Sequence, residues 1–310
     1  MLENKVSIVI PFLNEEDNIE ELVKYLNENC KEVPFDAEIV FVDDGSTDNS
    51  IEILKKQEHP NFEAKIVKLS KNYGSHNAIR AGIQNCTYDI CTFYSADLQE
   101  PFSIITRMYQ EIVNGFEIVC GYKENVKIGK VEKFFSNSYS RLIRKCAVKD
   151  FPLEGVNTIM FTQKVKKILN NNIEKNSSIM LQIIDMGFKK KFIPYSLTAR
   201  KQGKSKWTFG KRIKLFIDSF VNFSYLPIRA VSALGIIMSL VSIILAVGMT
   251  IYKLCIDNQL PMGYPTLIVV ILLGFGITNI SLGIVAEYIW RILDSTRERP
   301  AFIIDEIENI

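Results

Sequence analysis

Three short apolar runs in this chain of 310 residues end in polar side chains suited to metal and phosphate chemistry. The stretches are PFLNEE at 11–16, DDGSTD at 43–48 and SADLQ at 95–99. An aspartate in such a place can accept hydrogen bonds from the base or ribose of a nucleotide. Asp97 adds a hard oxygen ligand for Mg²⁺ or Mn²⁺, an ion that a bound diphosphate can share. Together the stretches indicate a nucleotide-diphosphate site with a divalent metal.

Each stretch also has a purely structural explanation. Ser, Thr and Asp favour turns and helix N-caps, so DDGSTD by itself could be a turn that precedes a helix. The stretch around Asp97 has one acid where a metal site often has two, and Ser95 stands two places earlier. It could be a working metal site, a weakened one, or the polar end of a buried strand. Its place directly after an apolar run favours a functional role.

An α/β fold would bring these three stretches together. Apolar runs predict strands at Val6–Ile10, Ala37–Val42, Lys65–Leu69, Ile90–Tyr94 and Phe116–Cys120. Between them, helices are expected near Asp17–Glu28, Asp48–Gln57, Ser75–Asn85 and Phe102–Asn114. Continuous apolar strands separated by helices predict a mainly parallel sheet with both faces covered. Ligands of such sheets bind at the carboxyl ends of the strands.

Composition excludes some functions and indicates a compartment. A net charge of +2 does not suggest a nucleic-acid binder. The 6 cysteines form no CxxC pair and no metal-finger spacing, which suits reduced, buried thiols in the cytosol. No secretory signal peptide is expected at the start, since the first apolar run is short and PFLNEE follows it at once.

The C-terminal part of the sequence predicts a membrane anchor. Residues 230–252 and about 265–288 form two apolar segments, each long enough to cross the roughly 30 Å hydrocarbon core as a helix. Basic residues precede the first and follow the second, which places residues 1–229 and the C-terminal tail in the cytoplasm of a multi-pass inner-membrane protein. Residues 208–229 have apolar side chains near helical spacing and predict an amphipathic helix in the headgroup region, or one packed on the soluble domain. Residues 1–207 are then the catalytic domain.

The order and spacing of several motifs resemble the family 2 glycosyltransferases with the GT-A fold. The matching elements are PFLNEE, VDDGSTDNS, SKNYGSHNAIRAGI and SADLQEP, over roughly residues 5–125. Downstream, ARKQGKSKW at 199–207 is similar to an R-x-x-G-x-S-K element. That element belongs to the branch that transfers sugars to polyprenyl phosphates, which includes bactoprenol glucosyltransferases and dolichyl-phosphate mannose synthases. The two C-terminal apolar segments resemble those of the bacterial members.

The resemblance implies a role for particular residues. The implied nucleotide-binding residues are Pro11, Leu13, Glu15, Phe41, Asp43, Asp44, Ser95, Ala96, Lys123 and Lys206. The implied catalytic residues are Asp97, Gln99 and Arg200, of which Asp97 and Gln99 would hold Mg²⁺ or Mn²⁺. Arg200 and Lys206 would hold phosphate groups, Arg200 as a fork and Lys206 as a point charge.

The chain departs from the family pattern at four positions. Ser95 stands where many relatives have the first acid of D-x-D, and Lys123 where they often have Arg. Asn157 and Ile159 replace an acid and an arginine near the expected acceptor site.

Of the 2 histidines, His59 is expected in a surface turn, and His76 is expected to open a helix as a cap or a pocket residue.

The implied reaction inverts the anomeric carbon. An oxygen of the lipid phosphate attacks the sugar as the nucleotide diphosphate leaves, and this nucleophile is already ionised and needs no strong base. A UDP donor and glucose are favoured, for modifying a cell-surface glycan or glycolipid, and a homo-oligomer is expected.

Two rival functions stay open. One is a processive polysaccharide synthase, although the Q/R-x-x-R-W element is absent, and the other is a catalytically silent membrane partner.

Overall fold

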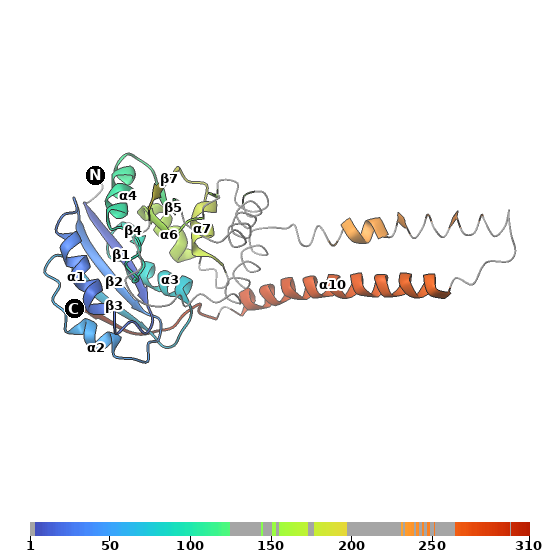
Figure 1. The fold of residues 1–310 in the computed structure, drawn as a ribbon, viewed down its shortest axis with the longest axis horizontal. Coiled ribbons are helices and arrows are strands. Elements are labelled where there is room, and N and C mark those ends of the chain that lie inside the picture. Colours follow the sequence, from blue (N-terminus) through green and yellow to red (C-terminus); the bar gives the residue numbers. More distant parts are fainter. Residues whose placement is uncertain are drawn as a thin grey trace. The chain divides into compact units, whose positions relative to one another are not determined.

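The structure of the protein is a computed structural model that describes two compact units of the chain. The described residues are 4–124, 144, 151–152, 155–172, 177–196, 264–297 and 299–310, with scattered positions between 231 and 251. One unit contains Met1–Asn222 and Pro300–Ile310, and the other contains Phe223–Arg299. The first unit holds the described strands (Figure 1).

A mixed sheet is the centre of the first unit. Its strands are β1 (Lys5–Phe12), β2 (Asp36–Asp43), β3 (Glu63–Leu69), β4 (Ile90–Phe93), β5 (Ile118–Lys123), β6 (Thr158–Phe161), β7 (Lys190–Tyr195) and β8 (Ile304–Asn309). They lie in the order β7-β5-β6-β4-β1-β2-β3-β8. Strands β1, β2, β3 and β4 are mutually parallel, whereas β6 runs antiparallel to both of its neighbours and β8 antiparallel to β3.

Helices cover both faces of this sheet. They are α1 (Ile19–Cys30), α2 (Ser50–Lys55), α3 (Ser75–Asn85), α4 (Ser103–Val113), α6 (Gln163–Asn171) and α7 (Ile179–Asp185). The apolar residues of α1, α2 and α4 share one buried cluster with alternate residues of β1 and β2. Helix α3 packs on β1, β2 and β3 with residues outside that cluster, and α6 packs on α3. Because both faces are covered, the central strands read as continuous apolar runs.

The predicted α/β order is confirmed over the first 124 residues. The five predicted strands and four predicted helices correspond to β1–β5 and α1–α4, with shifts of a few residues at their ends. Strands β6, β7 and β8 were not predicted. The short run Thr158–Phe161 carries no period that distinguishes strand from helix, and its antiparallel pairing depends on contacts distant in sequence.

Strand β8 brings the C-terminus of the chain back to the sheet. The Ser70 amide donates to the Ile303 carbonyl (3.0 Å), and Ile304 lies opposite Leu69, the last residue of β3. Lys68 forms an ion pair with Asp305 (3.2 Å). Because β3 is parallel to β1 and β2, the chain re-enters the sheet at the edge where those strands end.

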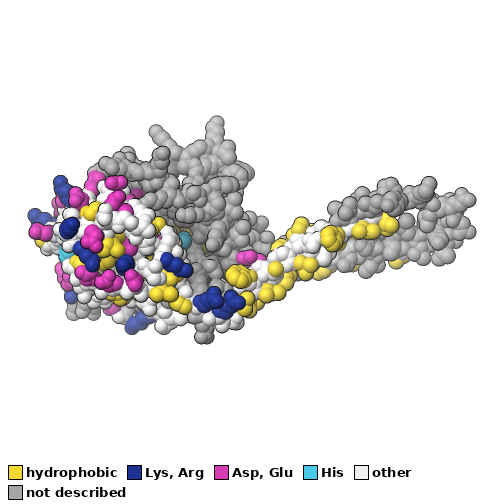
Figure 2. Space-filling model, turned by 90° about the horizontal axis from the view of Figure 1, so that it is seen from below, with side chains coloured by type: hydrophobic (Ala, Val, Ile, Leu, Met, Phe, Trp, Pro, Cys, Tyr) yellow, Lys and Arg dark blue, Asp and Glu magenta, His cyan; other side chains and the backbone are white. Residues whose placement is uncertain are grey.

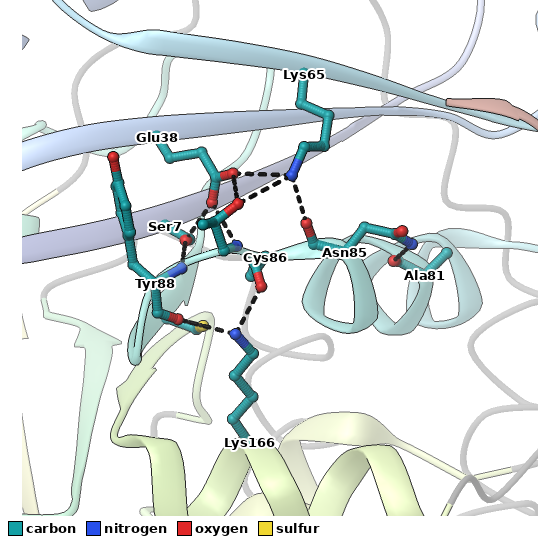
Figure 3. A network of polar contacts seen from close by, with 10 residues as sticks. Ser7, Glu38, Lys65, Ala81, Asn85, Cys86, Tyr88 and Lys166 are labelled. Atoms are coloured by element: carbon teal, nitrogen blue, oxygen red, sulfur yellow. Dashed lines mark hydrogen bonds and ion pairs between the residues drawn. The ribbon is translucent and has the colours of Figure 1, made fainter. Parts of the chain in front are cut away.

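A buried polar network ties β1, β2 and β3 together near their amino ends (Figure 3). The carboxylate of Glu38, a side chain that is 3% exposed, accepts hydrogen bonds from the hydroxyl of Ser7 and from Thr87, whose hydroxyl and amide lie at 2.6 and 2.8 Å. Lys65 pairs with the same carboxylate at 3.0 Å. Burial raises the pKa of Glu38, but the hydrogen bonds from Ser7, Thr87 and Lys65 outweigh it and hold that pKa below its usual value. The ionised carboxylate is therefore a structural group of the sheet.

The second unit contains helix α10 (Tyr264–Thr296). Many of its large apolar side chains are exposed (yellow along this helix in Figure 2), among them Leu267, Ile271, Phe275 and Ile280 at 57–67%. Within the described residues no helix meets the length and apolarity of a membrane span, so the two predicted spans are without support from the structure. The region 208–229 lies outside the described residues.

Candidate active site

The carboxyl ends of β1, β2 and β4 meet at one edge of the sheet. Phe12 at the end of β1 lies opposite Asp43 at the end of β2, and Val9 lies opposite Phe93 at the end of β4. The Tyr94 amide continues this pairing by donating to the Val9 carbonyl at 2.8 Å. The three polar stretches noted in the sequence therefore follow neighbouring strand ends, as predicted.

The first two stretches hold one another through reciprocal hydrogen bonds. The amide of Asn14, a residue with φ of +50°, donates to the hydroxyl of Ser46 (2.9 Å). The Asn14 side-chain oxygen accepts the amide of Thr47 in return (2.8 Å). The Glu15 amide donates to the Ser50 hydroxyl at 2.9 Å. The two loops form one frame, which fixes the geometry of the strand ends between them.

Gly45 and Asp44 position residues 71–74, the segment just before α3, against these two loops. Gly45 has a φ of +78°, and a Cβ there would lie 2.5 Å from the backbone carbonyl carbon of Lys71, so only glycine fits. The Asp44 carboxylate accepts the amides of Tyr73 (2.7 Å) and Gly74 (3.0 Å) just before α3. These bonds give Asp44 a structural role in the turn that leads to α3, and its predicted contact with nucleotide stays a prediction.

Asp43, which was predicted to contact the nucleotide, is the last residue of β2. The side chain is 0% exposed, and its Oδ1 accepts the amide of Ser46 at 2.9 Å. Its Oδ2 is buried and has no hydrogen-bond partner among the residues that the structure describes. A buried carboxylate oxygen without a donor is costly, so a ligand N–H or O–H that reached it would gain free energy. Asp43 is therefore the best-defined candidate contact for a nucleotide.

Phe41 requires a correction. It was predicted to face the base, but its side chain is 1% exposed in the cluster under α1 and α2, where it packs near Phe62 at a centroid distance of 6.5 Å. Side chains of a strand alternate between the two faces of the sheet, and Phe41 lies on the face that α1 and α2 cover. Its neighbours in the prediction, Pro11 and Leu13, are half-buried at the edge.

The loop after β4 carries Asp97 in a half-buried position. Its Oδ1 accepts the amide of Gln99 at 3.2 Å, and the intervening Leu98 has a φ of +54°. Ser95 is half-buried and Ala96 is 8% exposed beside it. This tight turn fixes Asp97 at the same edge as Asp43.

Glu100, which sequence reasoning missed, lies behind Asp97. Its side chain is 4% exposed, and its carboxylate accepts a hydrogen bond from the hydroxyl of Tyr195 at the end of β7. Burial raises the pKa of Glu100, and the nearby Asp97 raises it further, while the Tyr195 hydrogen bond and the charge of Lys123 oppose the shift. Lys123, at the end of β5, is therefore near enough for its charge to act on Glu100, and its predicted contact with nucleotide stays a prediction. The sequence signal that could have pointed to Glu100 is its position directly after Gln99.

The side chains fit a divalent ion only in part. Among the described residues there is no cluster of three or more His, Cys, Asp or Glu side chains that could hold a metal by itself. Asp97 offers one hard oxygen ligand, and Ser95 a hydroxyl instead of a second acid. A metal at this edge would therefore need further oxygen ligands from a bound substrate, and the phosphate oxygens of a nucleotide diphosphate can supply them.

Other predicted positions have different outcomes. Arg200 and Lys206 lie outside the described residues. Ile159 is 0% exposed within β6 and belongs to the core, while the amide of Asn157 donates to the Gly121 carbonyl at 3.1 Å. His76, in the first turn of α3, is neutral because burial, and secondarily the charge of Arg80, lower its pKa to about 4.

Comparisons with known proteins agree with this arrangement. Residues 7–180, more than half of the chain, match the family described as Glycosyl transferase family 2. The chain belongs to that family. A family 2 relative, the uncharacterized glycosyltransferase YkcC of Bacillus subtilis, is 33% identical over 98% of this chain and 95% of that protein. This family membership and the mixed α/β sheet agree with the GT-A-like fold that the resemblance implied.

Another family 2 relative has a more specific name. The undecaprenyl-phosphate 4-deoxy-4-formamido-L-arabinose transferase of Edwardsiella ictaluri is 30% identical over 97% of this chain and 94% of that protein. Among solved structures, a mannosyltransferase from Pyrobaculum calidifontis in complex with GDP-Man and Mn²⁺ is 19% identical, with a TM-score of 0.48 over 66% of this chain and 60% of that one.

Proposed function

We propose that this glycosyltransferase moves a sugar from a nucleoside diphosphate to a polyprenyl phosphate. The observation that carries the donor half is the pair formed by Asp43 and Asp97 at one edge of three parallel strands. Asp43 has a buried oxygen that needs a donor, and Asp97 has a half-buried carboxylate suited to a metal. The first fits a base or ribose, and the second fits a diphosphate with its metal. UDP and glucose are the favoured donor and sugar.

In this proposal each side chain of the edge has a defined task. Asp97 and Gln99 would hold Mg²⁺ or Mn²⁺, which supplies positive charge against the departing diphosphate. Lys123 contributes a further cation at the end of β5. Arg200 and Lys206 would bind phosphate groups of donor or acceptor. The attacking oxygen of a phosphate acceptor is already ionised at neutral pH, so the site needs no strong general base.

A lipid-linked acceptor requires a site close to a membrane. Relatives named as undecaprenyl-phosphate transferases support such an acceptor. The exposed apolar side chains of α10 form a surface that favours burial in lipid. The apolar segment is followed by Pro300–Ile310, and β8 joins the sheet at the carboxyl edge of β3. The chain therefore passes from residues 223–299 back into the sheet through β8. We place the enzyme at the inner membrane, with this edge in the cytoplasm, as a homo-oligomer.

The β8 pairing predicts the topology of this anchor. The two parts of the chain that flank residues 223–299 belong to one folded unit, so both must lie on one side of a bilayer. Epitope tags placed before Met1 and after Ile310 are expected to be accessible from the same side of sealed vesicles. A tag inserted at 258 tests whether the intervening segment crosses the membrane. Termini found on opposite sides would contradict the pairing of β8 with β3.

The donor half of the proposal is tested by Asp43→Asn. The substitution preserves size but removes the charge and replaces one acceptor oxygen by a donor. We expect UDP affinity to fall about tenfold to a hundredfold, the range of a lost hydrogen bond to a charged group. Isothermal titration with UDP and Mn²⁺ measures the change.

Asp36→Asn is the matched control for this experiment, since Asp36 is the exposed first residue of the same strand, β2. It is expected to leave UDP affinity unchanged. Equal affinities in wild type, Asp36→Asn and Asp43→Asn would remove Asp43 from the nucleotide site.

A further inference from the structure

The buried carboxyl group of Glu100 links the Asp97 loop to a strand that lies far from it in the sheet. The Tyr195 hydroxyl donates to Glu100 Oε1 at 2.5 Å, between residues 95 positions apart in the chain. The Tyr94 hydroxyl donates to the backbone carbonyl of Glu100. Tyr94 follows β4 and Tyr195 ends β7, and β5 and β6 lie between those two strands. Glu100 thus joins strand ends that do not pair with each other.

The surroundings of Tyr195 are arranged so that its hydroxyl reaches this loop. Tyr195 is 3% exposed, and its carbonyl accepts the amide of Glu124 at 2.8 Å. A Cβ on Gly121 would lie 2.8 Å from a methyl of Thr158 and 3.3 Å from the Tyr195 ring. Gly121 therefore leaves the room in which the Tyr195 ring packs. Strand β7 carries the Tyr195 ring and Gly121 of β5 leaves space for it, while the Tyr195 hydroxyl contacts Glu100.

This link has two ends, one in the Asp97 loop and one at the end of β7. On one side, Glu100 follows Gln99 directly, so its anchoring fixes the turn in which Asp97 accepts the Gln99 amide. On the other, Tyr195 is five positions before Arg200 in the sequence. The hydrogen bond between Glu100 and Tyr195 thus joins the Asp97 loop to the end of β7.

We propose that Glu100 and Tyr195 are positioning residues that fix the Asp97 loop against the end of β7. They touch neither donor nor acceptor, and they act by holding Asp97 in the place that a metal-bound diphosphate requires. Errors of about 1 Å in such a position cost up to a hundredfold in rate. The assignment rests on the proposed donor chemistry for its kinetic consequence but not for its structural one.

The test compares Tyr195→Phe, Glu100→Ala and Glu100→Gln in the full-length protein. Tyr195→Phe keeps the buried ring and removes only the hydroxyl. Glu100→Gln keeps an acceptor oxygen for that hydroxyl, whereas Glu100→Ala removes it. Tyr109→Phe is the matched control, because Tyr109 is also buried and its hydroxyl donates to Asn4 (2.9 Å) near the start of β1.

Amide hydrogen exchange without ligand gives the structural result. The peptide that covers residues 95–101 is expected to exchange severalfold faster in Tyr195→Phe and Glu100→Ala, and at the wild-type rate in Glu100→Gln and Tyr109→Phe. Unchanged exchange in Tyr195→Phe and Glu100→Ala would overturn the proposal. Acceleration spread equally over the whole first unit would also overturn it, since that indicates general destabilisation.

Kinetics give the functional result. Tyr195→Phe is expected to lower kcat about tenfold with less than a twofold change in KM for the donor, because the loop acts mainly on the transition state. Glu100→Gln should keep most of the wild-type kcat, because it keeps an acceptor for the Tyr195 hydroxyl. Equal kcat values in Tyr195→Phe and Tyr109→Phe would contradict a positioning role. Binding of UDP to the wild type reports separately on the proposed function, because the exchange experiment contains no nucleotide.

Discussion

Replacing Asp97 by asparagine is expected to lower sugar transfer at least about a hundredfold, the scale at which loss of one charge-stabilising group slows a reaction. Asp97 is the single acid of the SADLQ stretch, and its carboxylate lies at the edge where β1, β2 and β4 end. Asparagine keeps an oxygen that can accept the Gln99 amide, so the turn should persist. The loss then comes from the missing charge at the metal. The measurement is the initial rate of transfer at saturating Mn²⁺ and Mg²⁺.

A control at the other end of the same strand makes this result specific. Asp89 is an exposed acid just before β4, and its carboxylate accepts a hydrogen bond from the side chain of Gln163. Asp89→Asn should retain the wild-type rate. Full activity of Asp97→Asn with either metal would refute the metal assignment.

Metal affinity should also depend on bound nucleotide. The described residues contain no three-ligand cluster, and Ser95 provides a hydroxyl where a second carboxylate could stand. One carboxylate alone binds a divalent ion weakly, and diphosphate oxygens complete the coordination. Titration of Mn²⁺ with and without UDP is expected to give much tighter binding in the presence of the nucleotide. Equal affinities would mean that the protein holds the ion by other residues.

Replacing Glu38 by alanine is expected to reduce the free energy of unfolding of the first unit by about 3–5 kcal/mol, the usual cost of breaking a buried ion pair. The substitution leaves Lys65, whose side chain is 16% exposed, without its carboxylate. It also removes the acceptor of the Ser7 and Thr87 hydroxyls. Urea unfolding followed by circular dichroism measures the loss. Glu32→Ala, at an exposed position after α1, should change the stability by less than about 0.5 kcal/mol.

The pH dependence of this effect has a defined sign. The pKa of Glu38 is lowered in the folded protein, so its ionised form stabilises the fold above the unfolded-state value of about 4.3. This contribution is lost as the pH falls through the folded pKa. The stability difference between wild type and Glu38→Ala should therefore be constant near neutrality and shrink in acid. A difference that grew as the pH fell would contradict the ionised network.

The local parts of the fold and the donor edge could be predicted from the sequence. Runs such as Val6–Ile10 and the turn residues of DDGSTD have local signals, and strands that alternate with helices imply that their carboxyl ends meet. The same reasoning placed Asp43 and Asp97 at one edge. It could not place Phe41 under α1 and α2, because a continuous apolar strand gives no sign of which face of the sheet each residue lies on.

The remaining parts depend on contacts between distant segments. β8 pairs with β3 although more than 200 residues separate Leu69 from Ile304, and its sequence IDEIEN is not strongly apolar. Glu100 looks like one more acid of the SADLQEP stretch until Tyr195 is found beside it. Asp44 reads like Asp43 in the sequence, yet its carboxylate is used by Tyr73 and Gly74. No local pattern announces such partners.

The proposed reaction at the edge that holds Asp43 and Asp97 is the transfer of a sugar to a lipid-linked phosphate. Membranes that contain the protein would be incubated with polyprenyl phosphate and labelled nucleotide sugars, UDP-glucose first, followed by organic extraction. We expect label in the organic phase from one donor, its loss in Asp97→Asn, and its retention in Asp89→Asn. Intact UDP binding without organic-extractable label from any donor would contradict this account and favour a catalytically silent membrane partner with the same fold.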